Sequence, residues 1–290
     1  MTASKSLNRW SGYLFTLPYL LLFSMFIVLP LVYGLILSFC KWELLSQVPP
    51  KFIGIENYRK ASQDSYFWQA LFATAKFVVL AAPITVITAL TIALGLNSVK
   101  NKRQTVYRAA FFIPGMITIS VAGVLWRWFF NNEFGLFNAL LAPLNIQVPW
   151  ISDVKLAMPS IVLMTLWWTV GGPTVVLLAG IQQIAPQYLE AASLDGATNW
   201  QKFRFVTLPL LRPVLLFVGV LNVIGAFQVF GQVFMITRGG PENTTRTLVQ
   251  YIYETAFNNY HMGYAAALSW ILFLVIAVFS FIQFRLTRER

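Results

Sequence analysis

The chain has 290 residues, of which 58% are hydrophobic and 11% are charged, and its formal net charge at pH 7 is +11. Soluble domains carry roughly 45–50% apolar and about 25% charged residues, so this composition excludes an ordinary soluble domain and indicates a membrane protein with several spans. The basic charge does not argue for nucleic-acid binding, because the charged residues lie in short segments between apolar runs, where they orient membrane proteins.

Six apolar runs are long enough for a spanning helix of about 20 residues. They cover approximately residues 12–39, 70–96, 109–130, 156–181, 214–236 and 264–284. The first run has no small-residue cleavage site and is longer than the core of a signal peptide, so we expect a retained span. Several runs contain proline, which predicts a packed bundle whose helices are not all straight.

Six spans place both termini on one side of the membrane. Twelve of the lysines and arginines lie in the termini and in the loops on that side, and seven lie in the loops on the other side. This excess of positive charge predicts that the termini, and the loop between the fourth and fifth spans, are cytoplasmic. Lys76 and Arg127 lie near the predicted outer ends of their runs, and no acidic residue lies in the middle of a run, which disfavours a proton-driven carrier.

The predicted cytoplasmic loop contains a polar, helix-prone stretch with the sequence YLEAASLDGATNWQKFRFVTLP at residues 188–209. Pro186 suits the first turn of a helix, and Gly196 interrupts the helix that follows. Thr198, with Gln201 three residues later, is a capping-box pattern that predicts the start of a second helix. The stretch is therefore expected to form two short helices with a bend between them.

The second short helix is expected to carry Trp200, Phe203 and Thr207 on one side and to end at Pro209. Residue patterning alone leaves two interpretations of the helix pair open. It is either an amphipathic loop that lies on the membrane surface or an elbow that docks onto a cytoplasmic partner.

The stretch resembles the EAA loop of permease subunits from binding-protein-dependent ABC importers. The family pattern is Glu-Ala-Ala, three residues, Gly, nine residues, Ile, one residue and Leu-Pro. The residues at the corresponding positions are Glu190, Ala191, Ala192, Gly196, Val206, Leu208 and Pro209. Every spacing is met, and valine for isoleucine is the one departure. A second stretch, MITRGGPENTTRTLVQYIYETAF at residues 235–257, resembles the outward Gly-Gly-Pro loop of maltose-type and glycerol-phosphate-type sugar permeases.

The resemblance covers nearly the whole chain and implies an all-α membrane protein with the six-helix fold of type I ABC importer permeases. It implies an N-terminal part, residues 1–69, that holds the cytoplasmic N-terminal segment, the first transmembrane helix and the first external loop. Residues 70–290 would form the five-helix permease core, with the coupling loop at residues 182–213. We expect this protein in a bacterial or archaeal cell membrane, with the coupling loop in the cytoplasm.

The resemblance also implies a pore-forming subunit of an ATP-driven importer for a sugar or sugar-like solute, which is not itself an enzyme. The chain contains no Gly-Lys pair, so it has no P-loop. ATP and magnesium would be bound by a separate cytoplasmic ABC ATPase dimer, and no cofactor is expected in this chain. A second homologous permease subunit and an extracytoplasmic solute-binding protein would complete the transporter, with no role for nucleic acid.

The coupling residues that the resemblance implies are Glu190, Ala191, Ala192, Asp195, Gly196 and Trp200. In this family the elbow inserts into a cleft on the ATPase. Glu190 would anchor it through charge-assisted hydrogen bonds to basic groups. Ala191 and Ala192 would permit close approach, and Gly196 would set the bend.

Three amides in the fifth span are candidates for the solute path, because polar residues inside spans tend to face a cavity. At about 100° per residue of helix, Asn222, Gln228 and Gln232 fall within a sector of roughly 120°, which also contains Gly225. Amides suit hydroxyl-rich ligands because each can donate and accept hydrogen bonds. The alternative is that these amides only join helices.

Tryptophans in two spans could stack on sugar rings. Trp126 lies in the third run, and Trp168 or its neighbour Trp167 lies in the fourth. Packing between helices and location in an aromatic belt are the alternatives. Competing functions are a permease for a non-sugar solute, a secondary transporter without an ATPase, and a membrane-embedded enzyme. The enzyme is disfavoured because no cluster of Asp, Glu, His or Ser lies near an interface.

Overall fold

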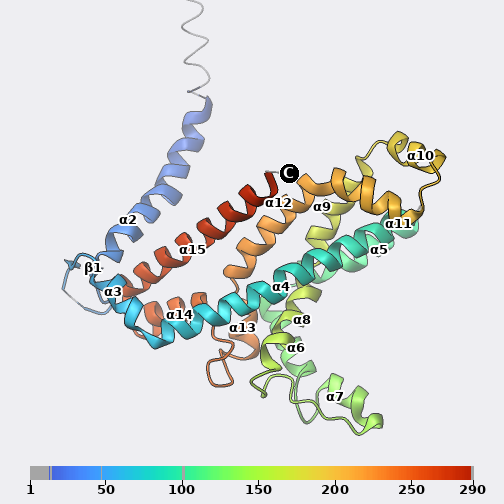
Figure 1. The fold of residues 1–290 in the computed structure, drawn as a ribbon. Coiled ribbons are helices and arrows are strands. Elements are labelled where there is room, and N and C mark those ends of the chain that lie inside the picture. The colour runs from blue at the N-terminus through green and yellow to red at the C-terminus, as the bar shows by residue number, and fades with distance from the viewer. Residues whose placement is uncertain (1–12, 14, 47, 100–101, 289–290) are drawn as a thin grey trace, which may run out of the picture. The chain divides into compact units, whose positions relative to one another are not determined.

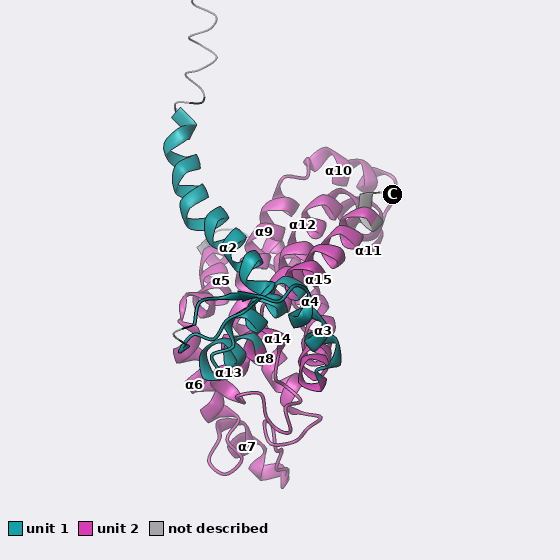
Figure 2. Cartoon of the chain, turned by 90° about the vertical axis from the view of Figure 1, so that its left-hand side faces the viewer, with its two compact units in different colours: residues 1–64, 252–271 teal, residues 65–251, 272–290 magenta. Residues whose placement is uncertain are grey.

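The computed structural model describes residues 13, 15–46, 48–99 and 102–288, and it is mostly helical (Figure 1). The chain forms two compact units (Figure 2). The first unit is Met1–Asp64 with Ile252–Ile271, and the second is Ser65–Tyr251 with Leu272–Arg290. The extreme ends of the chain, for which a cytoplasmic location is predicted, lie outside the described residues.

The first unit joins an apolar helix to a small extended segment. Its complete elements are η1 (Ser24–Val28), α2 (Leu29–Ser38), β1 (Cys40–Lys41), β2 (Lys51–Phe52), α3 (Glu56–Gln63) and η5 (Glu254–Asn258). The two strands pair antiparallel, with Cys40 opposite Phe52. The buried side chain of Asn57 holds this segment against α3, because its Nδ2 donates to the carbonyl oxygens of Ser38 and Cys40, each at 2.9 Å. The amide of Gly263, at the start of α15, donates to the Trp42 carbonyl oxygen at 3.2 Å.

The second unit contains most of the helices. Its elements up to residue 182 are α4 (Ser65–Ser98), α5 (Lys102–Phe112), η2 (Ile113–Met116), α6 (Ile119–Phe129), α7 (Leu136–Leu141), η3 (Ala142–Leu144), α8 (Ala157–Thr169) and α9 (Gly171–Gln182). The later elements are α10 (Pro186–Leu194), α11 (Asn199–Lys202), η4 (Phe203–Thr207), α12 (Leu208–Phe227) and α13 (Gly231–Ile236). Two helices, α14 (Leu248–Tyr253) and α15 (Met262–Arg288), contribute residues to both units.

The core of the second unit lies where α4, α9 and α12 pack together. Small side chains along α4, including the fully buried Ala89 and Ala93, let neighbouring helices approach closely. Leu177 and Leu178 of α9 and Leu211 of α12 fill the space between them, and all three are almost completely buried. Close packing of small and branched residues therefore sets the position of the three helices.

Within the part of the chain that the structure describes, four helices are long and apolar enough to cross a membrane. They are Phe15–Ser38, Ser65–Ser98, Asn199–Phe227 and Met262–Arg285, and two further helix pairs meet the same criterion with a bend inside each pair. The protein is therefore a mostly helical membrane protein with four candidate spans, or up to six if each bent pair is one span. The prediction that some helices are bent is confirmed.

The approximate ranges of the third and fourth runs implied continuous helices, but each run is broken. The third is bent by 96° between Met116 and Ile119, and the fourth by 52° between Thr169 and Gly171. In the third, Pro114 lies in the 3-10 turn η2, and Ile117 and Thr118 are extended. Proline removes a backbone donor and disfavours the helical conformation of the preceding residue, which explains why the helix stops there.

The fifth run also differs from its predicted limits. Its helix starts at Asn199 and ends at Phe227, and α13 follows after a break. The prediction that Pro209 ends the second elbow helix is wrong. The π-helical turn η4 precedes Leu208, whose amide hydrogen bonds back to the Phe203 carbonyl oxygen. This wider turn lets the helix continue through Pro209 without an interior donor at that position.

Candidate functional site

The residues that resemble a coupling loop form a distinct helical elbow between α9 and α12, made of α10, α11 and η4 (Figure 1). Pro186 is in the first turn of α10, as predicted, where its missing N–H leaves no intrahelical bond unmade. The helix ends at Leu194, and Gly196 has φ +78°. Glycine adopts this left-handed conformation without the steric penalty of a Cβ, so the bend favours a glycine.

The second helix of the elbow begins with the predicted capping box. The Thr198 amide donates to Gln201 Oε1 at 2.7 Å, and the Gln201 amide donates to Thr198 Oγ1 at 3.3 Å. These reciprocal bonds satisfy backbone donors that have no partner within the first turn of a helix. The Trp200 and Phe203 rings pack with centroids 5.5 Å apart, and Thr207 is buried.

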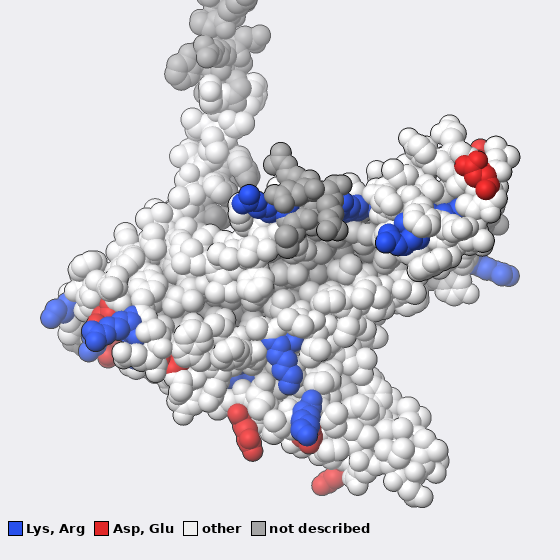
Figure 3. Space-filling model, in the orientation of Figure 1, with Lys and Arg blue, Asp and Glu red and all other residues white. Residues whose placement is uncertain are grey.

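The elbow exposes the side chains for which a docking role is predicted. Glu190, Ala191, Asp195, Gly196 and Trp200 are exposed, and Ala192 is half-buried. Figure 3 shows acidic side chains at the surface where α10 lies. Apolar side chains lie beside these carboxylates, and Leu194 and Trp200 keep 90% and 69% of their surface exposed. The surface therefore combines negative charge with uncovered apolar area.

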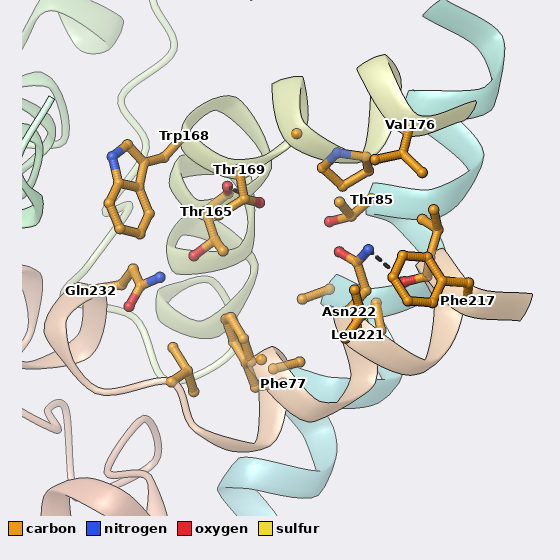
Figure 4. Close-up of a pocket in the computed structure, with 18 residues that line it drawn as sticks. Phe77, Thr85, Thr165, Trp168, Thr169, Val176, Phe217, Leu221, Asn222 and Gln232 are labelled. Carbon is orange, nitrogen blue, oxygen red and sulfur yellow. Dashed lines mark hydrogen bonds between the residues drawn. The ribbon is translucent and has the colours of Figure 1, made fainter. Parts of the chain in front are cut away.

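A cavity of about 470 Å³ lies within the second unit (Figure 4). Its walls come from α4, α8, α9, α12 and α13. Most of the lining is apolar, including Phe77 and Phe217. Its polar and indole side chains are Thr85, Thr165, Trp168, Thr169, Asn222 and Gln232. In Figure 4, Trp168 and Gln232 lie at one end and Phe217 and Val176 at the other.

Several polar groups of the cavity already make bonds within the protein. Thr165 and Thr169 donate to the carbonyl oxygens four residues earlier, each at 2.8 Å. Asn222 Nδ2 donates to the Val218 carbonyl oxygen at 2.9 Å, and Trp168 Nε1 donates to the Ile117 carbonyl oxygen at 2.9 Å. These bonds hold the side chains in fixed orientations around the cavity.

The structure brings together only some of the predicted solute-path residues. Asn222, Gln232 and Trp168 line the cavity, whereas Gln228 is exposed and Trp126 is outside the lining. The predicted single helical face is wrong, because α12 ends at Phe227 and Gln232 belongs to the next helix. Asn222 and Gln232 approach the same cavity because the chain breaks between them.

Trp126 belongs to an aromatic cluster away from the cavity lining. It is 5% exposed, and its ring centroid lies 5.3 Å from that of Phe130, 5.5 Å from that of Trp167 and 5.7 Å from that of Phe137. Such spacing is typical of packed aromatic side chains. The geometry of Trp126 is thus that of a core residue.

Sequence reasoning missed the threonines of the cavity. Thr165 and Thr169 are four residues apart on the fourth run, with Trp168 between them, so all three lie on one side of α8. This recurrence of hydroxyl and indole side chains within an apolar run was the available signal. Thr85 of α4 had no comparable pattern around it.

The two bent helix pairs contact each other near their breaks, beside the cavity. A Cβ built on Gly171 would overlap the Phe111 carbonyl oxygen and lie 2.8 Å from the Phe112 Cα. On the other side, a Cβ on Gly115 would lie 3.2 Å from the Trp168 carbonyl oxygen. The Trp168 indole donates a hydrogen bond to the carbonyl oxygen of Ile117, which lies within the first break. Glycines at these positions allow the two segments of the chain to approach closely.

The loop that carries the Gly-Gly-Pro motif is held by its own threonines. The hydroxyl groups of Thr237 and Thr245 form a hydrogen bond of 2.8 Å, and Thr245 Oγ1 donates to the Gly240 carbonyl oxygen at 2.7 Å. Exposed Arg238 and Glu242 have φ values of 52° and 49°, which non-glycine residues adopt only when their surroundings hold them. The backbone of the loop at these two charged residues is therefore held in a defined conformation.

Comparison with known proteins agrees with this architecture. The family model described as "Binding-protein-dependent transport system inner membrane component" matches residues 86–289. The lactose transport system permease protein LacF of Rhizobium radiobacter is 35% identical, over 100% of this chain and 99% of LacF. The trehalose/maltose transport system permease protein MalF of Thermococcus litoralis is 33% identical, over 96% of this chain and 94% of MalF.

A solved structure has the same fold. It is a chain from a bacterial alginate ABC transporter in complex with an alginate pentasaccharide-bound periplasmic protein. The alignment covers 98% of this chain and 96% of the other, with a TM-score of 0.86 and 22% sequence identity. The fold is thus that of an ABC transporter permease, as the coupling-loop motif indicated. With the family model matching from α4 to α15, the chain belongs to the family of binding-protein-dependent transport system inner membrane components.

Proposed function

We propose that the chain is the transmembrane subunit of an ATP-driven ABC importer and forms part of the translocation path for a sugar or sugar-like solute. Two observations support the solute class. The relatives LacF and MalF are named for lactose and for trehalose and maltose. The cavity offers hydroxyl and amide groups between aromatic walls, a combination that suits rings with one apolar face and several hydroxyls.

The observation that carries the coupling role is the surface of the elbow. A capped helix pair exposes Glu190 and Asp195 beside uncovered Leu194 and Trp200. Apolar side chains next to a fixed carboxylate are suited to a partner that offers an apolar cleft with basic groups. The partner we propose is an ABC ATPase subunit, which would bind ATP and magnesium and carry out hydrolysis.

The complete transporter that we propose contains further subunits. A cytoplasmic ATPase dimer would engage the elbows of this chain and of a second homologous permease. An extracytoplasmic solute-binding protein would deliver the solute to the opposite face, where the Gly-Gly-Pro loop is a candidate contact. The assembly would lie in a bacterial or archaeal cell membrane, with the elbow in the cytoplasm.

The test is ATP turnover by the complete transporter in proteoliposomes, with and without the solute-loaded binding protein. We expect Glu190→Arg to lower the stimulated rate at least tenfold, because truncating or reversing a buried interfacial charge commonly costs about 2–5 kcal/mol. The matched control is Glu133→Arg, which reverses an exposed carboxylate outside the elbow. It should leave the stimulated rate unchanged.

Two results would count against the proposal. Full stimulation in Glu190→Arg would remove the coupling role of the elbow. Solute accumulation by the purified chain without any ATPase would instead support the secondary transporter.

A further inference from the structure

The cavity lining lacks a charge that could neutralise a charged solute. All eighteen residues described around the cavity have neutral side chains. The two basic residues within the apolar runs, Lys76 and Arg127, are exposed and are not part of this lining. A carboxylate, sulfonate or phosphate inside the cavity would lose hydration without gaining an ionic partner from the chain, which is strongly unfavourable.

Several hydrogen-bond donors of the cavity are already used within the protein. The hydroxyl protons of Thr165 and Thr169 and the indole proton of Trp168 are already donated to backbone carbonyls. One N–H of Asn222 is donated to Val218 in the same way. The hydroxyl oxygens and Asn222 Oδ1 keep lone pairs that can accept from a ligand.

This balance distinguishes two kinds of saccharide. A hydroxyl group can donate to the threonine oxygens and to Asn222 Oδ1, whereas an ionised acid group can only accept. An acid group beside Thr165 and Thr169 would therefore meet hydroxyl oxygens whose protons are already donated to the backbone. The volume of about 470 Å³ is in the range of pockets that hold small organic ligands.

We infer that this cavity selects uncharged, hydroxyl-rich solutes and disfavours acidic saccharides of the same size. The inference rests on the proposed function, since it assumes that solute enters this cavity. It assigns the selectivity to the permease itself. Several hydrogen-bond donors of the cavity are already used within the protein, and no lining side chain carries a charge that could neutralise an acid group. Gln232, whose amide lies at one end of the cavity with Trp168, is the position where a single substitution would supply the missing charge (Figure 4).

The test is direct binding to the full transporter in lipid nanodiscs without the binding protein, so that the selectivity of that protein does not enter. The probes are lactose and the analogue in which one hydroxymethyl group is oxidised to a carboxylate, measured by ligand-observed NMR titration. Two further neutral oligosaccharides, each with its singly oxidised partner, complete the set. We expect each neutral saccharide that binds to bind at least tenfold more tightly than its acidic partner.

Substitution of the cavity wall tests the cause. Gln232→Arg should raise the affinity for the acidic partner at least tenfold relative to the neutral saccharide. Gln147→Arg makes the same change of charge at an exposed glutamine outside the cavity and should leave the ratio unchanged. The ratio is measured within each preparation, so a loss of folded protein does not imitate a change of selectivity.

The outcomes separate the inference from the proposed function. Equal binding of neutral and acidic partners to the unmodified transporter would overturn the inference and leave sugar transport standing. Tighter binding of the acidic partners would overturn it in the same way. No binding of any saccharide at millimolar concentration would overturn both the inference and the assignment of a sugar path to this cavity.

Discussion

Asn222 is oriented by its own helix. Its Nδ2 donates to the Val218 carbonyl oxygen, and this bond turns the amide along α12, so that it lines the cavity with Thr85 of α4 (Figure 4). The amide oxygen is then available to a ligand without any change of rotamer. An amide held in this way loses little conformational entropy when it binds solute.

Removal of that amide should weaken solute binding by about the free energy of one hydrogen bond. We expect Asn222→Ala to raise the half-saturating solute concentration for uptake about fivefold, since one net hydrogen bond contributes about 1 kcal/mol. Gln228→Ala should change it less, because Gln228 is exposed and outside the lining. Uptake by proteoliposomes over a range of solute concentrations measures both variants, and unchanged uptake in the double variant would contradict a solute path along this wall.

The candidate residues could be predicted from sequence only where a local pattern specifies the structure. Pro186, Gly196 and the Thr198–Gln201 pair act within one or two helical turns, and all three local predictions are confirmed. The relation of Asn222 to Gln232 was predicted from helical geometry, which failed when the helix ended between them. Residues from three other helices complete the cavity, and no local pattern specifies that arrangement.

At the scale of helices, the break after Phe227 depends on partners distant in sequence. Thr247 Oγ1 donates to the Val229 carbonyl oxygen at 2.8 Å and so satisfies an acceptor that the broken helix leaves free. Gly231, which begins α13, lies so near Ile119 that a Cβ would come within 2.8 Å of its side chain. Both contacts are tertiary, so an apolar run without an internal proline gave no local sign of the break.

The contact between the two bent pairs offers another test at this scale. Gly171 and Gly172 are adjacent, yet a Cβ on Gly171 would overlap the backbone of Phe111, whereas one on Gly172 would meet nothing within 4 Å. We expect Gly171→Ala to lower the thermal midpoint of the purified transporter by several degrees, because overpacking against backbone commonly costs about 1–3 kcal/mol. Gly172→Ala is the matched control and should shift the midpoint by much less.

A functional measurement shows whether this contact also matters for transport. Since the breaks lie beside the cavity, Gly171→Ala should reduce solute uptake more than it reduces basal ATP turnover. Equal thermal midpoints for the two alanine variants would contradict the close approach of α5 and α9.

At the scale of the whole molecule, orientation follows from the distribution of basic residues rather than from packing. The charge bias predicts a cytoplasmic C-terminus and an external segment around α7. Green fluorescent protein fused to the C-terminus should therefore fluoresce in cells, and alkaline phosphatase fused after Asn145 should be active. The reverse pattern of activities would show that the elbow faces away from the cytoplasm and would remove its proposed ATPase partner.

The continuous helix Asn199–Phe227 has a mechanical consequence. Its 29 residues extend about 44 Å at 1.5 Å per residue, with Trp200 near one end and Asn222 near the other. Such a rod acts as a lever, so a tilt of about 10° around its midpoint would displace Trp200 by roughly 3 Å and Asn222 by roughly 2 Å, in opposite directions. Movement of the elbow at Trp200 would thus be accompanied by an opposite shift of the cavity wall that carries Asn222.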